Sequence, residues 1–530
     1  MRSHDTNSSN NRIRSRLPLA LTAIVAIFAL ATTADAAQRL RSWPGGKVTP
    51  IGVAGGVPGI TGNPGGKPGT GGANTSGGRV LGYHNDRPLR PRWKPPIIVA
   101  VPSAVTAVTA VAAGNVNPQL NKGAGGGSRT GPQIAPRSYS GLPPVGERRY
   151  VPDEVLIQLA SSVPDAAIDA LARRMRLTRV ESFTSNGITM FRWKISDGRS
   201  VPEVIRSLQG LVLAAQPNYL YQLQEQPVPQ QSEATADTKG DHWQYALAKL
   251  RLPQAHELAR GEQVLIAVID SGVDTTHPEL EGMVVDSFDA LDSNEKPHPH
   301  GTAIAGAIVA HSRLMGAAPE ARILAARAFS AKARTAEATT YSINRGIDWA
   351  MSRGARIINM SFSGPRDPSI EQRLLQARKQ GIVLIAAAGN GGSKAPDAYP
   401  AAYPNVIAVT ATDADDHLFL GANRGRYIAV AAPGVELLLP APEATYQVAT
   451  GTSFAAAEVS GIVALMLERK PDLGHDGVRK TLIATARDLG PKGFDIQFGA
   501  GLVDAYQAVR SLAPAVATTG ARVTPAANRQ

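Results

Sequence analysis

The sequence contains no cysteine among its 530 residues, so no disulfide bond stabilises any part of the chain. Each folded domain must therefore be stabilised by its own core, which a domain of ordinary size achieves. Glycine and proline are abundant but follow no strict three-residue period, which excludes a collagen-like triple helix. Acidic residues nowhere show the ligand spacing of an EF-hand, so the sequence predicts no calcium loop of that kind.

The first apolar run, residues 19–31, is too short to span a membrane comfortably. Four arginines precede this run, and the small-residue sequence Ala34-Asp35-Ala36 follows it. A basic start, a short apolar centre and an A-x-A exit are typical of a secretory signal peptide. We therefore expect residues 1–36 to be a signal peptide and the protein to be secreted or periplasmic. An uncleaved membrane anchor is the alternative.

Residues 37–149 are rich in glycine and proline, and this composition buries too little apolar area to offset chain entropy. We expect a disordered spacer there and a disordered tail over 513–530. One apolar inclusion, residues 97–113 (IIVAVPSAVTAVTAVAA), is long enough to suggest a short membrane segment, although Pro102 and several hydroxyl residues weaken that interpretation.

Residues 150–225 have the pattern of a small α+β domain. Strands are expected at 154–160, 178–183 and 188–196, helices at 164–175 and 201–211, and a last strand near 212–224. This βαββαβ order predicts a ferredoxin-like sandwich. The polar stretch 226–241 is expected to be a linker.

Residues 242–512 alternate strand and helix patterns. Strands are expected at 264–270, 322–330, 355–362, 382–388, 406–412 and 427–432, and helices at 337–353, 369–380, 452–470 and 477–486. Alternation of this kind predicts an α/β fold, with a parallel sheet covered by helices on both faces.

Three segments of this region carry candidate catalytic residues. Asp270 ends an apolar run in VLIAVIDSGVDTTHPEL, His300 opens HGTAIAGAIVAH, and Ser453 lies among small residues in GTSFAAAEVSG. A serine hydroxyl becomes a good nucleophile when a base removes its proton, and a helix N-terminus suits the resulting oxyanion. Each residue alone also has a structural interpretation, as a strand-end cap, a helix N-terminal residue or an N-cap.

Together these segments, in the order Asp, His, Ser, resemble the three active-site signatures of the subtilisin-like serine proteases, the subtilases. Two more segments, ARIINMSFSG at 355–364 and IVLIAAAGN at 382–390, resemble the family's substrate-pairing strand and oxyanion-hole segment. The resemblance covers roughly residues 242–512. By its position, the α+β domain resembles a subtilase propeptide, which in that family assists folding and blocks the cleft. The linker 226–241 would then be the segment that is cut. An unrelated accessory binding domain is the alternative.

The resemblance implies roles for individual residues. Ser453 would attack the scissile carbonyl, His300 would carry the proton, and Asp270 would orient the imidazole. Asn390 would donate to the oxyanion. The backbone of Ser361, Phe362 and Ser363 would pair with an extended substrate, and Ala387, Ala388 and Gly389 would line the pocket for the residue before the cleaved bond. No cofactor is required; calcium occurs in the family, but no metal ligand is assigned here.

The sequence departs from the family pattern after the nucleophile, at Phe454, Ala457 and Glu458, and at Ser363. Phe454 is expected to pack, and Glu458 to be favoured by the dipole near the helix start. Ser363, where glycine is usual, narrows the expected substrate cleft. None of these changes removes a catalytic group, so we expect them to alter the shape of the site more than its chemistry.

The region 241–513 differs from the rest of the chain in net charge. Residues 241–513 contain 26 Lys and Arg against 29 Asp and Glu, whereas the whole chain has a net charge of +12. A protein that binds nucleic acid needs a basic folded face, which the region 241–513 lacks, so we expect no nucleic-acid partner. The expected partners are polypeptide substrates and the chain's own propeptide. The sequence thus predicts a monomeric, secreted endopeptidase made as a zymogen. The alternative is a weakly active or inactive binding protein on a protease fold.

Overall fold

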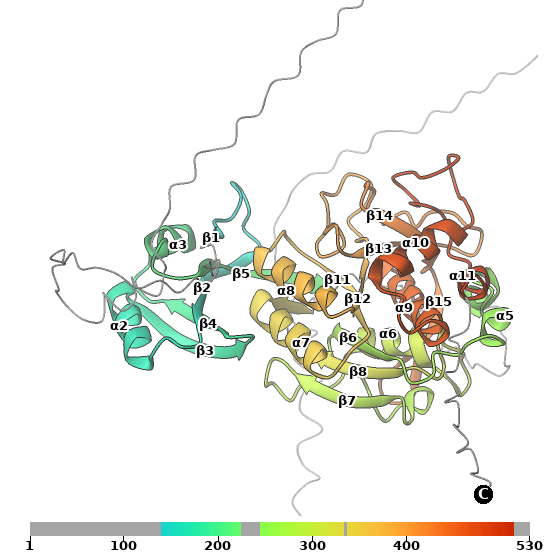
Figure 1. Ribbon diagram of the computed structural model, residues 1–530, viewed down its shortest axis with the longest axis horizontal. Helices are drawn as coiled ribbons and strands as arrows, with labels where there is room; N and C mark the ends of the chain where they lie inside the picture. Colours follow the sequence, from blue (N-terminus) through green and yellow to red (C-terminus); the bar gives the residue numbers. More distant parts are fainter. Residues whose placement is uncertain (1–138, 224–243, 333–335, 513–530) are drawn as a thin grey trace, which may run out of the picture. The chain divides into compact units, whose positions relative to one another are not determined.

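The computed structural model describes residues 139–223, 244–332 and 336–512. These residues form an N-terminal domain (139–223) and a C-terminal domain (244–512), whose elements are shown in Figure 1. The predicted signal peptide, residues 97–113, the linker and the tail lie outside the described residues. Within the described residues, no helix has the length and apolar composition needed to span a membrane.

The N-terminal domain is the predicted βαββαβ unit with one short strand before it. Its elements are β1 (Tyr139–Ser140), β2 (Tyr150–Ala160), α2 (Asp165–Met175), β3 (Leu177–Ser185), β4 (Ile188–Ile195), α3 (Val201–Leu208) and β5 (Ala214–Leu223). The strands follow the order β1-β5-β2-β4-β3, antiparallel except for the β1–β5 pair. Strand β1 falls within residues that the sequence assigned to the spacer, so the folded part begins earlier than predicted.

The two faces of this small sheet pack against different partners. Alternate residues of β2, Val155 and Ile157, join a core with the two helices of the domain. Leu156 points to the other face, where it packs with Met190 of β4 and Tyr341 of the C-terminal domain. Because strand side chains alternate, one strand contributes to the domain's own core and to the interface with the C-terminal domain.

The C-terminal domain is built on a seven-stranded sheet with the order β14-β13-β12-β10-β6-β8-β7, and every neighbouring pair is parallel. Its strands are β6 (Leu265–Asp270), β7 (Val284–Asp289), β8 (Arg322–Arg327), β10 (Ile357–Met360), β12 (Val383–Ala387), β13 (Ile407–Thr412) and β14 (Ile428–Pro433). The parallel sheet predicted from the alternation is confirmed.

Helices cover both faces of this sheet. The principal ones are α6 (Pro299–Val309), α7 (Thr340–Ser352), α8 (Pro368–Lys379) and α9 (Thr452–Arg469), with α4 (Tyr245–Lys249), α5 (Leu252–His256), η2 (Pro278–Leu280), α10 (His475–Thr485) and α11 (Ala505–Arg510) around them. Ile266 and Val268 of β6 pack in the cluster that contains α6 and α9, whereas Ala267 and Ile269 pack with α7 and α8. The strands are therefore buried on both sides, as parallel sheets usually are (Figure 1).

Two features of this domain differ from the sequence prediction. The expected helix 337–353 is divided, because β9 (Glu337–Thr339) is a strand and α7 begins at Thr340 after a capping box made by Thr339 and Ser342. The sequence also gave no sign of the hairpin formed by β15 (Leu437–Ala441) and β16 (Thr445–Ala449).

A short strand, β11 (Phe362–Ser363), follows β10 and does not join the parallel sheet. Strand β5 of the N-terminal domain pairs antiparallel with both β9 and β11. The N-terminal domain is thus joined to the C-terminal domain by backbone hydrogen bonds as well as by side-chain packing.

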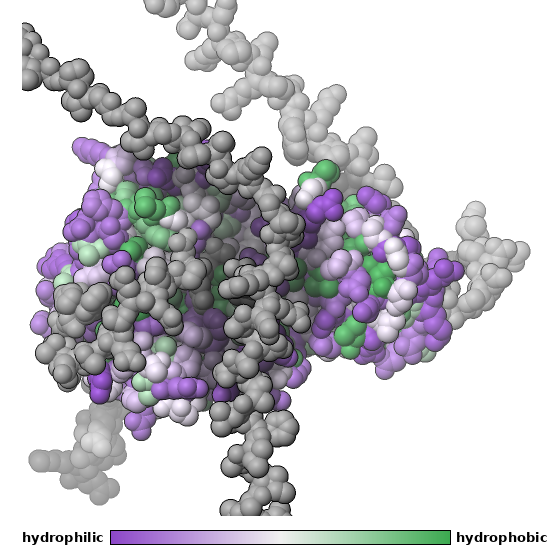
Figure 2. Space-filling model, turned by 180° about the vertical axis from the view of Figure 1, so that it is seen from behind, coloured by the Kyte–Doolittle hydropathy of each residue, from purple (hydrophilic) through white to green (hydrophobic). Residues whose placement is uncertain are grey.

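The described surface has few large hydrophobic side chains. Leu420 and Phe494 are among the most exposed, at 96% and 53% of their area. On the face shown in Figure 2, hydrophobic residues form small separate patches among hydrophilic ones. Single exposed apolar residues are normal on soluble domains and indicate no particular partner.

Candidate active site

Asp270 and His300 form a buried hydrogen-bonded pair. Asp270 is the last residue of β6, and His300 is the second residue of α6. His300 Nδ1 lies 2.8 Å from Asp270 Oδ1 and 3.0 Å from Oδ2, and both residues are 1% exposed. A carboxylate that accepts the Nδ1 proton fixes the tautomer in which Nε2 is the basic nitrogen.

The pairing depends on close backbone packing around Asp270. The backbone N–H and the hydroxyl of Ser271 donate to Asp270 Oδ1 at 2.8 and 2.9 Å, so this oxygen accepts from Ser271 as well as facing the His300 imidazole. A Cβ at Gly301 would overlap the carbonyl group of Gly272, so a glycine after His300 is required for this approach. No role was assigned to Gly301 from the sequence, and Ser271 was not identified as a support for the acid.

Ser453 is the second residue of α9, which packs against α6. Its hydroxyl donates to the carbonyl oxygen of Ser361 at 3.2 Å, and the Ser361 hydroxyl donates to the Ser453 carbonyl oxygen at 3.0 Å. The ring of the next residue, Phe454, lies 5.6 Å from that of His300, and Phe454 is 2% exposed, so the predicted packing of Phe454 is confirmed. The start of α9 is therefore fixed beside both the imidazole and the strand after β10.

Asn390 lies beside the start of α9. Its amide oxygen accepts from the backbone N–H of Thr452 at 3.1 Å and from the Thr452 hydroxyl at 2.7 Å. The same hydroxyl accepts from the N–H of Gly389 at 3.1 Å. Because Thr452 holds the amide oxygen, the orientation of the Asn390 amide is set, and its NH2 is the donating end.

Asn423 supports the loop that carries Asn390. It is 3% exposed, its backbone N–H donates to the carbonyl of Gly389 at 3.0 Å, and its side-chain oxygen accepts from Gly391 at 2.8 Å. Gly389 has a φ of +109°, and a Cβ there would lie 2.7 Å from the Asn423 side chain. Sequence analysis missed Asn423 and Thr452, since their roles depend on contacts with residues distant in sequence.

The predicted substrate-binding residues fall into two groups. Ser361 is fully buried beside Ser453, while Phe362 and Ser363 form β11 and pair with Leu223 and Gln222 of β5. In the second group, Ala387 ends β12, and Ala388 and Gly389 follow it and lead to Asn390; both alanines are fully buried. The structure brings both groups to the carboxyl edge of the sheet, next to the start of α9, where open α/β sheets build their sites.

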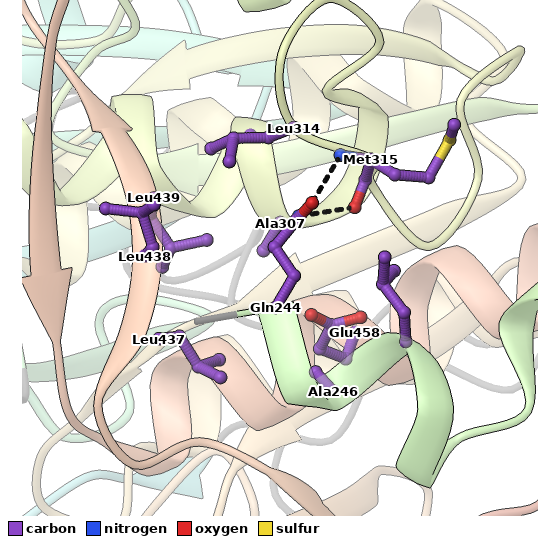
Figure 3. A pocket seen from close by; sticks show the side chains of 11 residues that line it. Gln244, Ala246, Ala307, Leu314, Met315, Leu437, Leu438, Leu439 and Glu458 are labelled. Carbon is purple, nitrogen blue, oxygen red and sulfur yellow. Dashed lines mark hydrogen bonds between the residues drawn. The ribbon is translucent and has the colours of Figure 1, made fainter. Parts of the chain in front are cut away.

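The Glu458 side chain is more buried than its expected position near the helix start implied. It is the seventh residue of α9, 6% exposed, and faces a small cavity of about 10 Å³ that is also lined by Gln244, Met315 and the strand β15 (Figure 3). Among the described residues, Glu458 Oε2 has no hydrogen-bond partner, and burial raises the Glu458 pKa to about 8. The expected benefit from the helix dipole is therefore wrong, because the carboxyl lies beyond the first turn of the helix.

No metal site is evident in the parts of the chain that the structure describes, where no three acidic or histidine side chains gather at binding distance. Apart from Glu458, the polar residues described above are held by one another and by backbone groups. Their arrangement combines an oriented base, a serine at a helix start and an oriented amide donor, which is the set of groups required for acyl transfer by an activated serine.

Comparisons with known proteins match both domains. The profile described as the subtilase family matches residues 261–501, and that of the fervidolysin N-terminal prodomain matches residues 138–218. Thermitase of Thermoactinomyces vulgaris is 34% identical over 275 residues, which cover 50% of this chain and 96% of thermitase. A thermophilic serine proteinase of Bacillus sp. strain AK1 is 31% identical over 371 residues, or 68% of this chain and 88% of that protein.

A solved structure resembles the two domains together. The crystal structure of fervidolysin from Fervidobacterium pennivorans, described as a keratinolytic enzyme related to subtilisin, aligns with a TM-score of 0.59 and 25% sequence identity. The alignment covers 72% of this chain and 64% of the fervidolysin chain, so less than two thirds of that protein has a counterpart here.

Proposed function

Because the chain belongs to the subtilase family of serine peptidases, we propose that it is a secreted endopeptidase, made as an inactive precursor and matured by cleavage after the N-terminal domain. The observation that carries the proposal is the buried Asp270–His300 pair, at 2.8 Å, beside the helix that starts at Thr452 and presents Ser453. Burying polar groups of this kind requires free energy during folding, and a role in proton transfer explains why the chain places them there.

In the proposed reaction, Ser453 Oγ attacks the carbonyl carbon of the scissile bond while His300 Nε2 takes its proton. His300 then gives the proton to the leaving amine, and water hydrolyses the acyl-enzyme through the same base. Asp270 stabilises the imidazolium that forms in each step. The Asn390 NH2 and the Ser453 backbone N–H donate to the tetrahedral oxyanion, and loss of one such donor typically costs about 100- to 1000-fold in turnover.

The N-terminal domain supports the zymogen part of the proposal. Its last strand, β5, pairs with β9 on one side and β11 on the other, as an extended substrate would when added to a sheet. Antiparallel pairing sets Leu223 opposite Phe362, so a chain that continues in register meets Ser361 one residue later. Ser361 is the residue that exchanges hydrogen bonds with Ser453. We therefore expect maturation to cut the bond between residues 224 and 225, and the N-terminal domain to inhibit until it leaves.

Secretion is proposed from the sequence of residues 1–36, with its basic start, short apolar centre and A-x-A exit. Expression with the natural leader should release the protein from the cytoplasm with an N-terminus at residue 37. Protein that stays in the membrane fraction with residues 1–36 intact would instead support an uncleaved anchor.

The catalytic proposal is tested by the change Ser453→Ala in the full-length chain. The parent should convert itself to a form that begins at residue 225 and should react with a fluorophosphonate probe, whereas the variant should stay full length and unlabelled. The matched control is Ser352→Ala, an exposed serine at the end of α7, which should mature like the parent. A parent that stays full length and does not react with the probe would instead favour a binding protein on a protease fold.

A further inference from the structure

A second cavity of the C-terminal domain, with a volume of about 440 Å³, lies outside the candidate active site. Helices α4 and α5 form one side of it, and residues 311–315, which follow α6, form the other. Gln244, Leu314 and Met315 line both this cavity and the small cavity at Glu458 (Figure 3). Because His300 is at the opposite end of α6, the second cavity is about 15 Å along that helix from the catalytic base. Its volume is in the range of pockets that bind small molecules, roughly 300 to 1,000 Å³.

The ionisable side chains that line the second cavity are all basic. They are Arg260, Arg313, His256 and His311, and no acidic side chain of the described residues lines it. Arg260 is paired with Glu320 at 2.5 Å, whereas Arg313 is exposed and forms no ion pair within the described part of the chain. The cavity therefore presents an uncompensated positive charge and favours an anionic ligand, in a domain where acidic residues outnumber basic ones.

The backbone around Arg313 is held in place without a ligand. The N–H groups of Ser312, Arg313 and Leu314 donate to the carboxylate of Glu279 at 2.8 to 3.1 Å. The hydroxyl of Tyr446 donates to the same carboxylate at 2.9 Å. Glu279 is fully buried, so its two oxygens accept from four donors and are shielded from solvent. A turn that is already fixed loses little entropy when a ligand binds, which raises the affinity.

The second cavity also offers a hydrogen-bond acceptor on His256. His256 Nε2 lies 3.1 Å from the carbonyl oxygen of Ala317, and because a carbonyl only accepts, this nitrogen carries the proton of the neutral ring. Burial lowers the pKa of His256, so the ring is neutral near pH 7 and Nδ1 is an acceptor. Nδ1 makes no hydrogen bond within the described residues. A simple anion leaves this acceptor unused, whereas a ligand that also carries an N–H group satisfies it.

We propose that the second cavity binds the free carboxyl end of an apolar peptide. The carboxylate is placed at Arg313, because a guanidinium group donates two parallel hydrogen bonds to a carboxylate, and a peptide N–H is placed at His256 Nδ1. Leu247, Leu252 and Leu314 line the cavity and are available to the apolar side chains of the peptide. Hydrolysis of peptide bonds releases such ends, but binding requires no catalysis, so the inference is tested independently of the proposed function.

The first experiment measures binding by calorimetry to the full-length Ser453→Ala protein. Strand β5 occupies the position between β9 and β11 in this protein, so a peptide cannot add to those strands instead. N-acetyl-leucyl-leucine should bind with a Kd of about 0.1 to 1 mM. Its C-terminal amide should bind about 10-fold more weakly, at the lower end for a charged hydrogen bond because Arg313 is exposed. The analogue with an N-methyl group on the last residue loses one neutral hydrogen bond and should bind about 3- to 10-fold more weakly.

Three outcomes would overturn the inference. The first is no binding of the peptide acid at about 10 mM, which is well above the expected Kd. The second is equal binding of the acid and its amide, which would exclude recognition of a carboxylate. The third is equal binding of the acid and its N-methyl analogue, with decanoate bound as tightly as either, which would mean that the cavity accepts any apolar carboxylate and recognises no peptide group.

The second experiment locates the site. Arg313→Gln, in the same Ser453→Ala background, should weaken binding of the acid about 10-fold and leave binding of the amide unchanged. Arg424→Gln, at another exposed arginine, is the matched control and should bind the acid like the parent. Unchanged affinity of folded Arg313→Gln for the acid overturns the assignment. Hydrogen exchange of the Ser453→Ala protein gives a measure that needs no further variant: the peptide acid should slow exchange over residues 311–315, and slowing confined to other segments would also overturn it.

Discussion

The internal cores of the two domains contain different kinds of side chain. The core between the sheet and helices of the N-terminal domain consists of apolar residues such as Val155, Ile157 and Phe191. The C-terminal domain buries Asp270 and His300 within its fold, at 1% exposure each. Burying polar groups lowers stability unless they are paired, and Asp270 and His300 are paired with each other, so the C-terminal domain can bury the two groups that the proposed chemistry requires.

The two sheets also differ in how far apart their paired strands lie in the sequence. Strands β3 and β4 are joined by a two-residue turn, Asn186–Gly187, with positive φ at both residues, which is the preferred hairpin geometry. In the C-terminal domain, β10 pairs Ile357 with Ile266, which is about ninety residues earlier. Local pairing forms quickly and distant parallel pairing slowly. The N-terminal domain is thus suited to fold first and to present β5 to β9 and β11.

The largest expected effect concerns the buried acid. Asp270→Asn keeps the shape of the side chain but no longer favours the His300 tautomer with a basic Nε2, so we expect self-maturation to slow by about 10⁴-fold. The rate of conversion of purified full-length protein measures this. The matched control is Asp274→Asn, four residues on, whose carboxylate accepts from Thr276 and Glu443 and does not contact His300. Equal slowing by both changes would mean that Asp270 acts only through the fold.

Glu458 carries a buried carboxyl that takes no part in the proposed reaction. The Glu458 pKa is about 8 in the folded protein, against about 4.5 when exposed, so the unfolded state binds fewer protons between these values. Stability therefore falls as pH rises from 4.5 to 8. The phenol of Tyr245, which donates to the carbonyls of Thr412 and Val435, is a titratable group near Glu458. Burial is the main cause of its raised pKa, and the charges of Asp413 and Glu458 add to it.

Glu458→Gln removes this dependence, and the stabilisation should approach about 3 to 5 kcal/mol above pH 8 and vanish below pH 4.5. Urea unfolding at pH 5 and pH 9, in the Ser453→Ala background to prevent self-digestion, measures it. Glu257→Gln, at an exposed position, is the control and should change neither midpoint. Equal shifts of the Glu458→Gln midpoint at both pH values would contradict a titrating carboxyl.

Features that depend on short local sequence patterns could be predicted. Asp270, His300 and Ser453 lie in short motifs at a strand end and at two helix starts, and the carboxyl-edge rule brings such positions together. The βαββαβ order followed from alternation and spacing within about 75 residues. In each case the determining residues are neighbours in the chain.

Features that depend on distant partners were not predicted. Glu337–Thr339 has a composition compatible with a helix, and it becomes strand β9 because β5 offers it hydrogen bonds from more than one hundred residues away. The support that Asn423 gives to Gly389 and Gly391 consists of side-chain and backbone contacts with no periodic signal. Glu458 was expected near the helix start. Its burial depends on β15 and Gln244, which line the same cavity but are distant from the start of α9 in the sequence.

Phe191 tests whether the core of the N-terminal domain acts only through folding. Phe191 is 1% exposed, packs against Trp193, and lies far in sequence from the catalytic groups. Phe191→Ala should destabilise this domain by about 3 to 4 kcal/mol and lower the yield of matured enzyme. Active-site titration should then give an unchanged kcat per matured molecule, because an enzyme matured by the proposed cleavage no longer contains residue 191. A lower kcat would mean that the folding route leaves a lasting difference in the C-terminal domain.

The smallest expected effect lies at the interface between the domains. Asn218 is fully buried, its side-chain oxygen accepts from the N–H of Tyr341 at the start of α7, and its NH2 donates to Glu154 at 2.7 Å. Asn218→Ala removes this capping hydrogen bond to the first turn of helix α7, which is worth about 1 to 2 kcal/mol. The cleaved N-terminal domain should therefore inhibit about 5- to 30-fold more weakly. The lag between self-cleavage and the appearance of activity should shorten accordingly. Gln209→Ala, at an exposed position in the same domain, is the control and should leave the lag unchanged. If Asn218→Ala also leaves it unchanged, the backbone pairing of β5 with β9 and β11 carries the inhibition, and the helix cap contributes only to folding.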